Sequence, residues 1–200
     1  MMIALLDTSQ DLHLCGEELS CGVGQLLTPL TRYRLRDPLK PWAIDNGAFA
    51  RFEAKAYLSL LKREEHHKEN CIFVTAPDVV GSARRTLEVF DHWKTKLTGW
   101  KLALVIQDGQ QDLPIPWGEI SAVFIGGSTN FKLSAHVQHV IKAAQALDKW
   151  VHVGRVNDKE RFMYFEELGA DSIDGTGLAR YTHMREKVGA RESQERLFQS

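Results

Sequence analysis

Short apolar runs along this chain repeatedly end in a carboxylate, an amide or a pair of glycines. In each case the run is typical of a buried β-strand, and the polar or glycine residues follow it directly. The segments with this pattern are residues 42–47, 73–78, 104–109, 123–127 and 170–175. In parallel α/β folds the loops that follow the strands meet at one mouth, where the active site is built. The pattern therefore predicts an enzyme whose site residues come from successive strand ends.

Helical patterns separate most of these runs. The expected helices are residues 52–68, 83–96, 134–147 and 158–168, and the expected strands are 2–6, 42–44, 71–76, 102–106, 122–125, 150–153 and 172–173. Residues 7–41 contain several Gly and Pro residues, and we expect mostly loop there, with short helical pieces. About seven parallel strands with helices between them fit a trimmed TIM-like (β/α) barrel better than an open sheet. We therefore expect an α/β fold with a single domain over residues 1–200.

Composition restricts the compartment and the partners. The formal net charge of −1 means that a nucleic-acid partner needs a local basic patch. An odd number of cysteines, without a signal-like start or a long apolar span, predicts a reduced cytoplasmic protein with no membrane role. Cys15 and Cys21 are too far apart for a zinc knuckle, and no Cys or His cluster follows Asp174. We expect no metal and no cofactor.

Asp45 and Asp174 are the strongest catalytic candidates. They lie far apart in the sequence, but both follow apolar runs, and a closed barrel would bring them face to face. Two carboxylates across a small pocket can divide nucleophilic and acid–base work, as in glycosidic-bond hydrolysis. A structural role is the alternative, because Asp-Asn-Gly and Asp-Gly are turn signals and Asp174 also suits a helix N-cap.

Several binding candidates follow the neighbouring runs. Asp78 is either a helix cap or an acceptor for the N–H groups of a planar ring, and Gln107 is either a satisfied core amide or a reader of a nucleobase edge. Gly126 and Gly127 bring bare backbone to the mouth, where they could meet a base or a phosphate. Phe49 could stack on a base or fill the core.

Basic residues gather after the last apolar run. Arg180, Arg185 and Lys187 form the most plausible local patch for contacts with a nucleic-acid backbone. The alternative is that they are charges on a solvated helix face.

The order of these segments resembles that of the tRNA-guanine transglycosylase superfamily. Residues 45–49, Asp-Asn-Gly-Ala-Phe, resemble the Asp-Ser-Gly-Gly-aromatic motif of that family, and Asp78 lies where the family has its base-recognising Asp. Residues 106–109 resemble its Ile-Gln-Gln-Gly segment, 125–127 its Gly-Gly loop, 153–156 its Met-Gly-Val-Gly strand, and 169–174 the segment that ends in its nucleophile. The matches are collinear from Trp42 to about Arg180.

The resemblance implies roles for these residues. Asp174 would attack C1′ of a nucleotide flipped from its strand, and Asp45 would assist as acid or base. The residues that would hold the base are Asp78, Gln107, Gly126 and Gly127, with Asn46 and Phe49 in the matched motif beside them. The zinc ligands that follow the family's nucleophile are missing, so the chain most resembles reduced, zinc-less relatives that act on DNA, of the 7-deazaguanine DNA transglycosylase-like and phage-defence DNA glycosylase-like kinds.

Three functions follow from these patterns. The first is cleavage of the N-glycosidic bond of a modified base in DNA, either as a glycosylase that leaves an abasic site or as a transglycosylase that inserts a 7-deazaguanine-type base into DNA or tRNA. The second is a non-catalytic reader of a modified base. The third is a phosphate-binding barrel that acts on a small sugar phosphate. We expect the first, with hydrolysis favoured over exchange.

Overall fold

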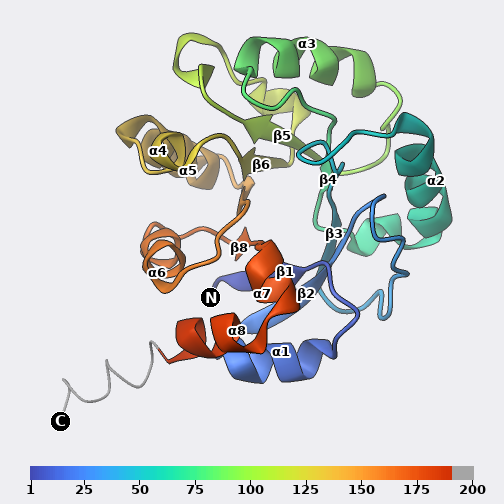
Figure 1. The fold of residues 1–200 in the computed structure, drawn as a ribbon. Helices are drawn as coiled ribbons and strands as arrows, with labels where there is room; N and C mark the ends of the chain where they lie inside the picture. Colours follow the sequence, from blue (N-terminus) through green and yellow to red (C-terminus); the bar gives the residue numbers. More distant parts are fainter. Residues whose placement is uncertain (191–200) are drawn as a thin grey trace.

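The computed structural model describes residues 1–190, which form a closed barrel of eight parallel strands (Figure 1). The last strand pairs with the first, with Ile3 opposite Ser172. This closure confirms the predicted TIM-like α/β fold; residues 191–200 of the expected domain lie outside the described residues. The strands are β1 (Ile3–Leu6), β2 (Gly22–Leu27), β3 (Trp42–Ile44), β4 (Val74–Thr75), β5 (Leu102–Ile106), β6 (Ala122–Ile125), β7 (Trp150–Val153) and β8 (Ser172–Ile173).

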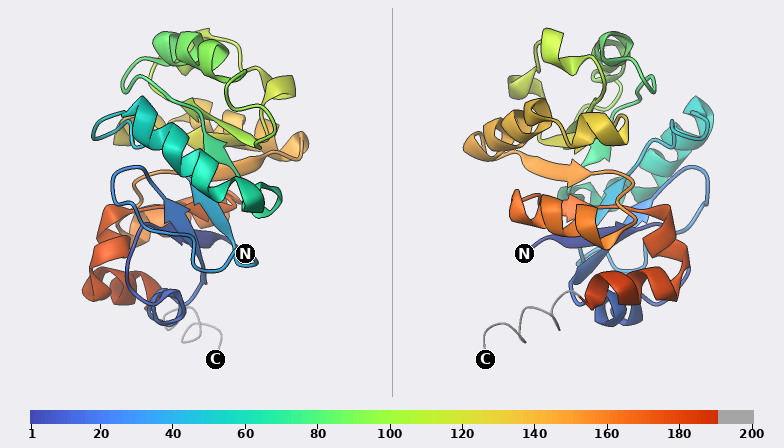
Figure 2. Two further views of the ribbon diagram at one scale, coloured as in Figure 1. Left: turned by 90° about the vertical axis from the view of Figure 1, so that its right-hand side faces the viewer. Right: turned by 60° about the vertical axis from the view of Figure 1, so that its left-hand side comes forward.

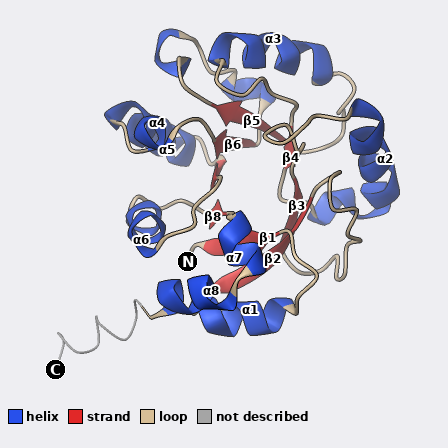
Figure 3. Ribbon diagram, viewed as in Figure 1, coloured by secondary structure: helices blue, strands red, loops and turns tan. Residues whose placement is uncertain are grey.

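The helices form a ring outside the strands (Figure 3). Serine or aspartate side chains cap several of them; for example, Ser82 accepts from Arg85 N–H, and Asp158 accepts from Arg161 N–H at 2.9 Å. No helix among residues 1–190 is both long and apolar enough to cross a membrane. The α-helices are α1 (Leu12–Leu19), α2 (Ala54–Glu64), α3 (Ala83–Trp93), α4 (Thr129–Lys132), α5 (Ala135–Ala146), α6 (Lys159–Glu167), α7 (Thr176–Arg180) and α8 (Thr182–Gly189), and the 3₁₀ helices are η1 (Glu65–Asn70), η2 (Gln110–Asp112) and η3 (Trp117–Glu119).

The apolar core has two layers because alternate residues of a strand face opposite sides. One layer, which includes residues from the helices, lies between the barrel and the helix ring. The other fills the barrel interior and consists of Leu5, Leu26, Ala43, Phe73, Ala103 and Ala122, with four partly buried apolar side chains against them. These side chains fill the barrel below its mouth. The space left for a ligand therefore lies at the carboxyl ends of the strands.

The prediction for residues 7–41 was partly wrong. This stretch contains α1 and a full strand, β2, so the barrel has eight strands and not about seven. The glycines of β2 reflect close packing and not a loop, since a Cβ at Gly24 would lie 2.4 Å from the Pro41 carbonyl oxygen. Residues 28–41 then return to the start of β3 as an irregular crossover without a helix.

The first and last helices lie side by side, as both views of Figure 2 show for the blue and red ends of the chain. Arg185 on α8 joins them. Its guanidinium pairs with Glu18 of α1 and donates to the Leu178 carbonyl at 2.7 Å and to Gln10 Oε1 at 2.5 Å.

Candidate functional site

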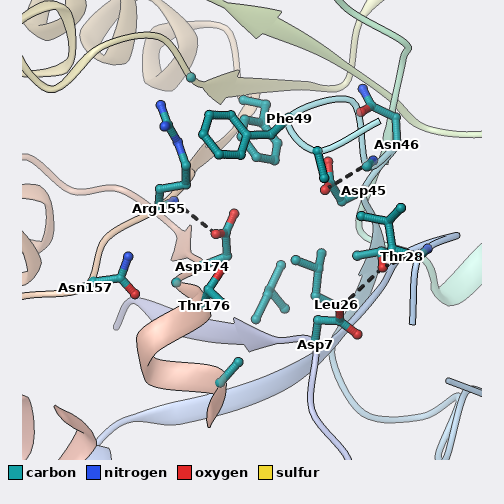
Figure 4. A pocket seen from close by; sticks show the side chains of 18 of the residues that line it. Asp7, Leu26, Thr28, Asp45, Asn46, Phe49, Arg155, Asn157, Asp174 and Thr176 are labelled. Atoms are coloured by element: carbon teal, nitrogen blue, oxygen red, sulfur yellow. Dashed lines mark hydrogen bonds between the residues drawn. The ribbon is translucent and has the colours of Figure 1, made fainter. Parts of the chain in front are cut away.

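A cavity of about 770 Å³ opens at the carboxyl ends of the strands (Figure 4). Its walls come from the loops after the strands, as the strand-end pattern predicts. The structure brings together nine of the predicted site residues in its lining: Asp45, Asn46, Phe49, Asp78, Gln107, Gly126, Gly127, Asp174 and Arg180.

Asp174 follows β8 and is held by two donors. His152 Nε2 lies 3.0 Å from Asp174 Oδ2, and the backbone N–H of Arg155 donates to Oδ1 at 3.0 Å. Because an ionised carboxylate only accepts, Nε2 carries the proton of this hydrogen bond. The Asp174 side chain is 15% exposed, so it still reaches the cavity.

His152 continues this contact into the barrel interior. Its ring is fully buried against Phe124, with ring centroids 4.5 Å apart. Its Nδ1 lies 2.8 Å from Ser172 Oγ. The same Oγ accepts the indole N–H of Trp150 at 2.8 Å. This chain of hydrogen bonds fixes the ring, and the ring in turn fixes the Asp174 carboxylate.

Asp45 follows β3 and faces Asp174 across the cavity (Figure 4). Burial, and next the negative charges of Asp174 and Asp78, raise the pKa of Asp45 to about 7. The backbone N–H of Gly47 donates to its Oδ2 at 3.4 Å. Asp45 can therefore hold or release a proton near neutral pH, as a general acid or base requires.

Asp78 lies in a network of side-chain amides. Asn46 Nδ2 donates to Asp78 Oδ1 at 2.9 Å, and Gln107 Nε2 donates to Oδ2 at 2.8 Å. Gln107 Nε2 also lies 2.8 Å from Thr86 Oγ1, and Gln107 Oε1 accepts from Gly81 N–H at 2.6 Å. The amide of Gln107 is therefore satisfied by the protein itself. Asp78 is only partly buried and lines the cavity, and burial raises its pKa.

The Gly126–Gly127 turn is shaped by packing. A Cβ at Gly126 would lie 2.9 Å from Val105 Cγ1, and one at Gly127 would lie 2.6 Å from Asp108 Oδ2. Gly127 also has a φ of +75°, which favours glycine. Its carbonyl oxygen accepts from the guanidinium of Arg155, and that guanidinium lies 4.2 Å from the centre of the Phe49 ring. Arg155 therefore links two of the predicted site residues.

The structure separates the three residues of the predicted basic patch. Arg185 is completely buried in the contact between α8 and α1, so the prediction that it contacts a nucleic-acid backbone is wrong. Lys187 is exposed on α8 but is not part of the cavity lining. Arg180 is exposed and lines the cavity. Nothing near Arg185 in the sequence indicates its partner, because Glu18 lies 167 residues away.

Asp7, which sequence reasoning missed, also lines the cavity. It follows β1 and accepts from Thr31 Oγ1 at 2.7 Å and from Thr28 Oγ1 at 3.3 Å. Burial raises its pKa, with a smaller contribution from the charge of Asp174. Like Asp45, Asp7 directly follows an apolar run. The same pattern in residues 2–7 would therefore have identified it.

Lys132 is a buried cation in the cavity wall that the sequence did not indicate. Its Nζ donates to the Gly154 carbonyl at 2.6 Å, and burial lowers its pKa to about 8. The N–H of the same peptide bond, that of Arg155, donates to Asp174. Lys132 thus helps to fix the peptide that positions Asp174.

Among residues 1–190, no three His, Cys, Asp or Glu side chains are grouped so that they could hold a metal ion.

Comparisons with known proteins find only distant likenesses, all among solved structures. No family model and no curated protein matches the chain. A phosphoribosyl anthranilate isomerase from Thermus thermophilus is 12% identical, with a TM-score of 0.49, over 98% of this chain and 100% of that one. A native KDPGal structure is 11% identical, with a TM-score of 0.46, over 100% and 96%. The PaMucR phosphodiesterase in complex with c-di-GMP is 14% identical, with a TM-score of 0.42, over 70% and 61%. No statement about activity follows from likenesses at this level.

Proposed function

We propose that this protein cleaves the N-glycosidic bond of a modified base in DNA and acts as a DNA glycosylase that leaves an abasic site. One observation carries the proposal: two carboxylates with different surroundings face each other across one cavity. Asp174 is fixed by His152 and a backbone N–H, whereas Asp45 has a pKa of about 7. The collinear resemblance to the tRNA-guanine transglycosylase superfamily assigns the same two residues to this chemistry.

The mechanism has two displacements at the same carbon. The Asp174 carboxylate attacks C1′ of a flipped nucleotide, the bond from C1′ to the base breaks, and protonated Asp45 gives its proton to the leaving base. Asp45, now ionised, then takes a proton from water. The resulting hydroxide displaces Asp174 from C1′, and an abasic sugar remains.

The base would lie beside Asp78. The carboxylate of Asp78 accepts two hydrogen bonds from the protein and offers its remaining lone pairs to N–H donors of a base. Gln107 and Asn46 hold this carboxylate in place and do not themselves read the base. A cavity of about 770 Å³ lies in the usual range for small-ligand sites.

Base exchange would share the first displacement. A second base, in place of water, would then displace Asp174, so neither DNA nor tRNA would gain an abasic site, and the DNA would remain unbroken in alkali. A silent reader would bind the modified base and release nothing. These two functions are therefore the other outcomes of the test.

The test measures released base and abasic sites together. The protein is incubated with DNA that carries modified bases and with matched unmodified DNA, free bases are identified by mass spectrometry, and strands are heated in alkali. We expect a released base and alkali-sensitive breaks. Asp174→Asn should lose several orders of magnitude in rate while remaining folded. Asp148→Asn, at an exposed left-handed turn that suits Asn, is the matched control. Near-wild-type turnover by Asp174→Asn would remove Asp174 from the mechanism.

A further inference from the structure

Large apolar side chains are exposed at one side of the cavity mouth. Among residues 1–190, the exposed large apolar residues that also line the cavity are Leu30 (48% exposed), Phe49 (65%) and Val80 (50%). They come from three consecutive loops, those after β2, β3 and β4. Leu30 lies against the second of these loops, since a Cβ at Gly47 would be 3.2 Å from Leu30 Cγ. These three side chains, here called the apolar rim, border one side of the mouth.

Exposed arginines lie in the same chain segments as Leu30 and Val80 of the apolar rim. Arg32 lies between the cavity-lining residues Thr31 and Tyr33, and Arg84 and Arg85 begin the helix that follows Val80. Within residues 1–190, no side-chain hydrogen bond or ion pair joins the guanidinium groups of Arg32, Arg84 and Arg85 to another residue. Their charge is therefore available to an anion from solution.

The cavity itself contains charges of both signs. Its lining includes four carboxylates and four cations: Asp7, Asp45, Asp78, Asp174, Lys132, Arg155, Arg161 and Arg180. The exposed arginines beside the apolar rim are therefore additional positive charges, and they attract a polyanion to that side of the mouth.

We propose that the apolar rim and its three arginines are a docking surface for a single-stranded segment of nucleic acid. The bases beside the flipped nucleotide stack on Leu30, Phe49 and Val80, and their phosphates pair with Arg32, Arg84 and Arg85. Stacking of bases on aromatic side chains, combined with basic residues along the backbone, is how proteins hold single strands without reading their sequence. Phe49 supplies the aromatic face here, and Leu30 and Val80 add apolar contacts beside it. The inference rests on the proposed function only in that the flipped base enters the same cavity.

The charge arm of the test uses fluorescence anisotropy with a labelled single-stranded oligodeoxynucleotide across a range of salt concentrations. The triple variant Arg32→Ala, Arg84→Ala, Arg85→Ala should reduce the slope of log K against log salt by about 2, from about 0.7 per contact on a single strand. The control triple Lys55→Ala, Lys62→Ala, Lys142→Ala removes the same charge from exposed positions on α2 and α5. It should keep the wild-type slope.

The stacking arm replaces the rim side chains one at a time. Phe49→Ala should weaken single-strand binding by between about 5-fold and 150-fold for a base that loses its aromatic platform. Leu30→Ala, which removes an apolar contact only, should weaken binding less. Leu147→Ala, at an equally exposed leucine outside the cavity lining, should not weaken binding. Circular dichroism checks that all variants are folded.

Equal slopes for the two triple variants, or tighter binding of the same sequence as a duplex, would overturn this inference. Base release by the wild type would then still support the proposed function. Conversely, the expected slopes without base release from any substrate would support the docking surface and contradict the proposed function.

Discussion

Asp45 and Asp174 are the same side chain in two different surroundings. Asp174 accepts from His152 and from the Arg155 backbone at 3.0 Å each, whereas Asp45 accepts from Gly47 at 3.4 Å. Burial comes first among the causes that raise the pKa of Asp45, and the charge of Asp174 comes next. Two carboxyl groups with different surroundings in one cavity are the arrangement that a division of acid and base work requires.

The raised pKa of Asp45 makes stability depend on pH. The pKa rises from 3.8 to about 7 on folding, so the folded protein binds a proton at Asp45 more tightly than the unfolded chain does. The contribution of Asp45 to the free energy of unfolding therefore falls as the pH rises from about 4 to about 7. Asp45→Asn stays neutral at every pH.

We expect Asp45→Asn to melt at a higher temperature than the wild type at pH 8, with a smaller difference at pH 5. Thermal denaturation followed by circular dichroism at both pH values measures this, with Asp148→Asn as the exposed control. An equal difference at the two pH values would contradict the assigned pKa.

At the scale of the elements, the loop between β4 and α3 is held in place by a side chain that follows the neighbouring strand β5. Gln107, at the end of β5, is 1% exposed and reaches Asp78, Thr86 and Gly81. The loop is thus held in place before a base arrives. In the proposed function, Gln107 is then a positioning residue and Asp78 is the residue that meets the base.

Gln107→Ala removes the partners of several buried groups at once. We expect a loss of about 1–3 kcal/mol in the free energy of unfolding and slower release of every accepted base, without a change in their ranking. Asp78→Asn should instead change the ranking of the bases, because it replaces a carboxylate that only accepts with an amide that both donates and accepts. Base release from a panel of modified DNA substrates separates the two. Gln110→Ala, another buried glutamine that lies outside the cavity lining, is the control.

Sequence patterns predicted those strands and cavity-lining residues that depend only on their neighbours in the sequence. The apolar run before Asp174 and the polar group after it are neighbours in the sequence, so the strand end and its carboxylate could be read together. β2 was missed because the reason for Gly24 is the Pro41 carbonyl, which no pattern in residues 22–27 reveals. The role of Arg185 was missed for the same reason, because its partner Glu18 lies on the first helix.

At the scale of the whole molecule, the barrel closes where its first and last strands pair. β8 has two residues and pairs with β1, and α8 packs against α1 outside them. The buried pair of Arg185 and Glu18 joins the two helices. This closure holds Asp174 in position, because Asp174 directly follows β8.

Arg185→Met should therefore weaken the whole fold. Loss of one partner leaves the other charge poorly solvated, and for buried pairs this costs about 3–5 kcal/mol. Chemical denaturation should show this loss, and a second replacement, Glu18→Gln, should recover part of it. Lys187→Met, exposed on the same helix, should change the free energy of unfolding by no more than about 0.5 kcal/mol. Similar effects of the two single variants would contradict a closing role for Arg185.

The first and last strands of the barrel supply neighbouring parts of one cavity. Asp7 follows the first strand and Asp174 follows the last. Domains form during synthesis from the N-terminus onwards, so a nascent chain on the ribosome has neither the closed barrel nor Asp174 until β8 has emerged. The proposed chemistry therefore begins only after translation has passed residue 174.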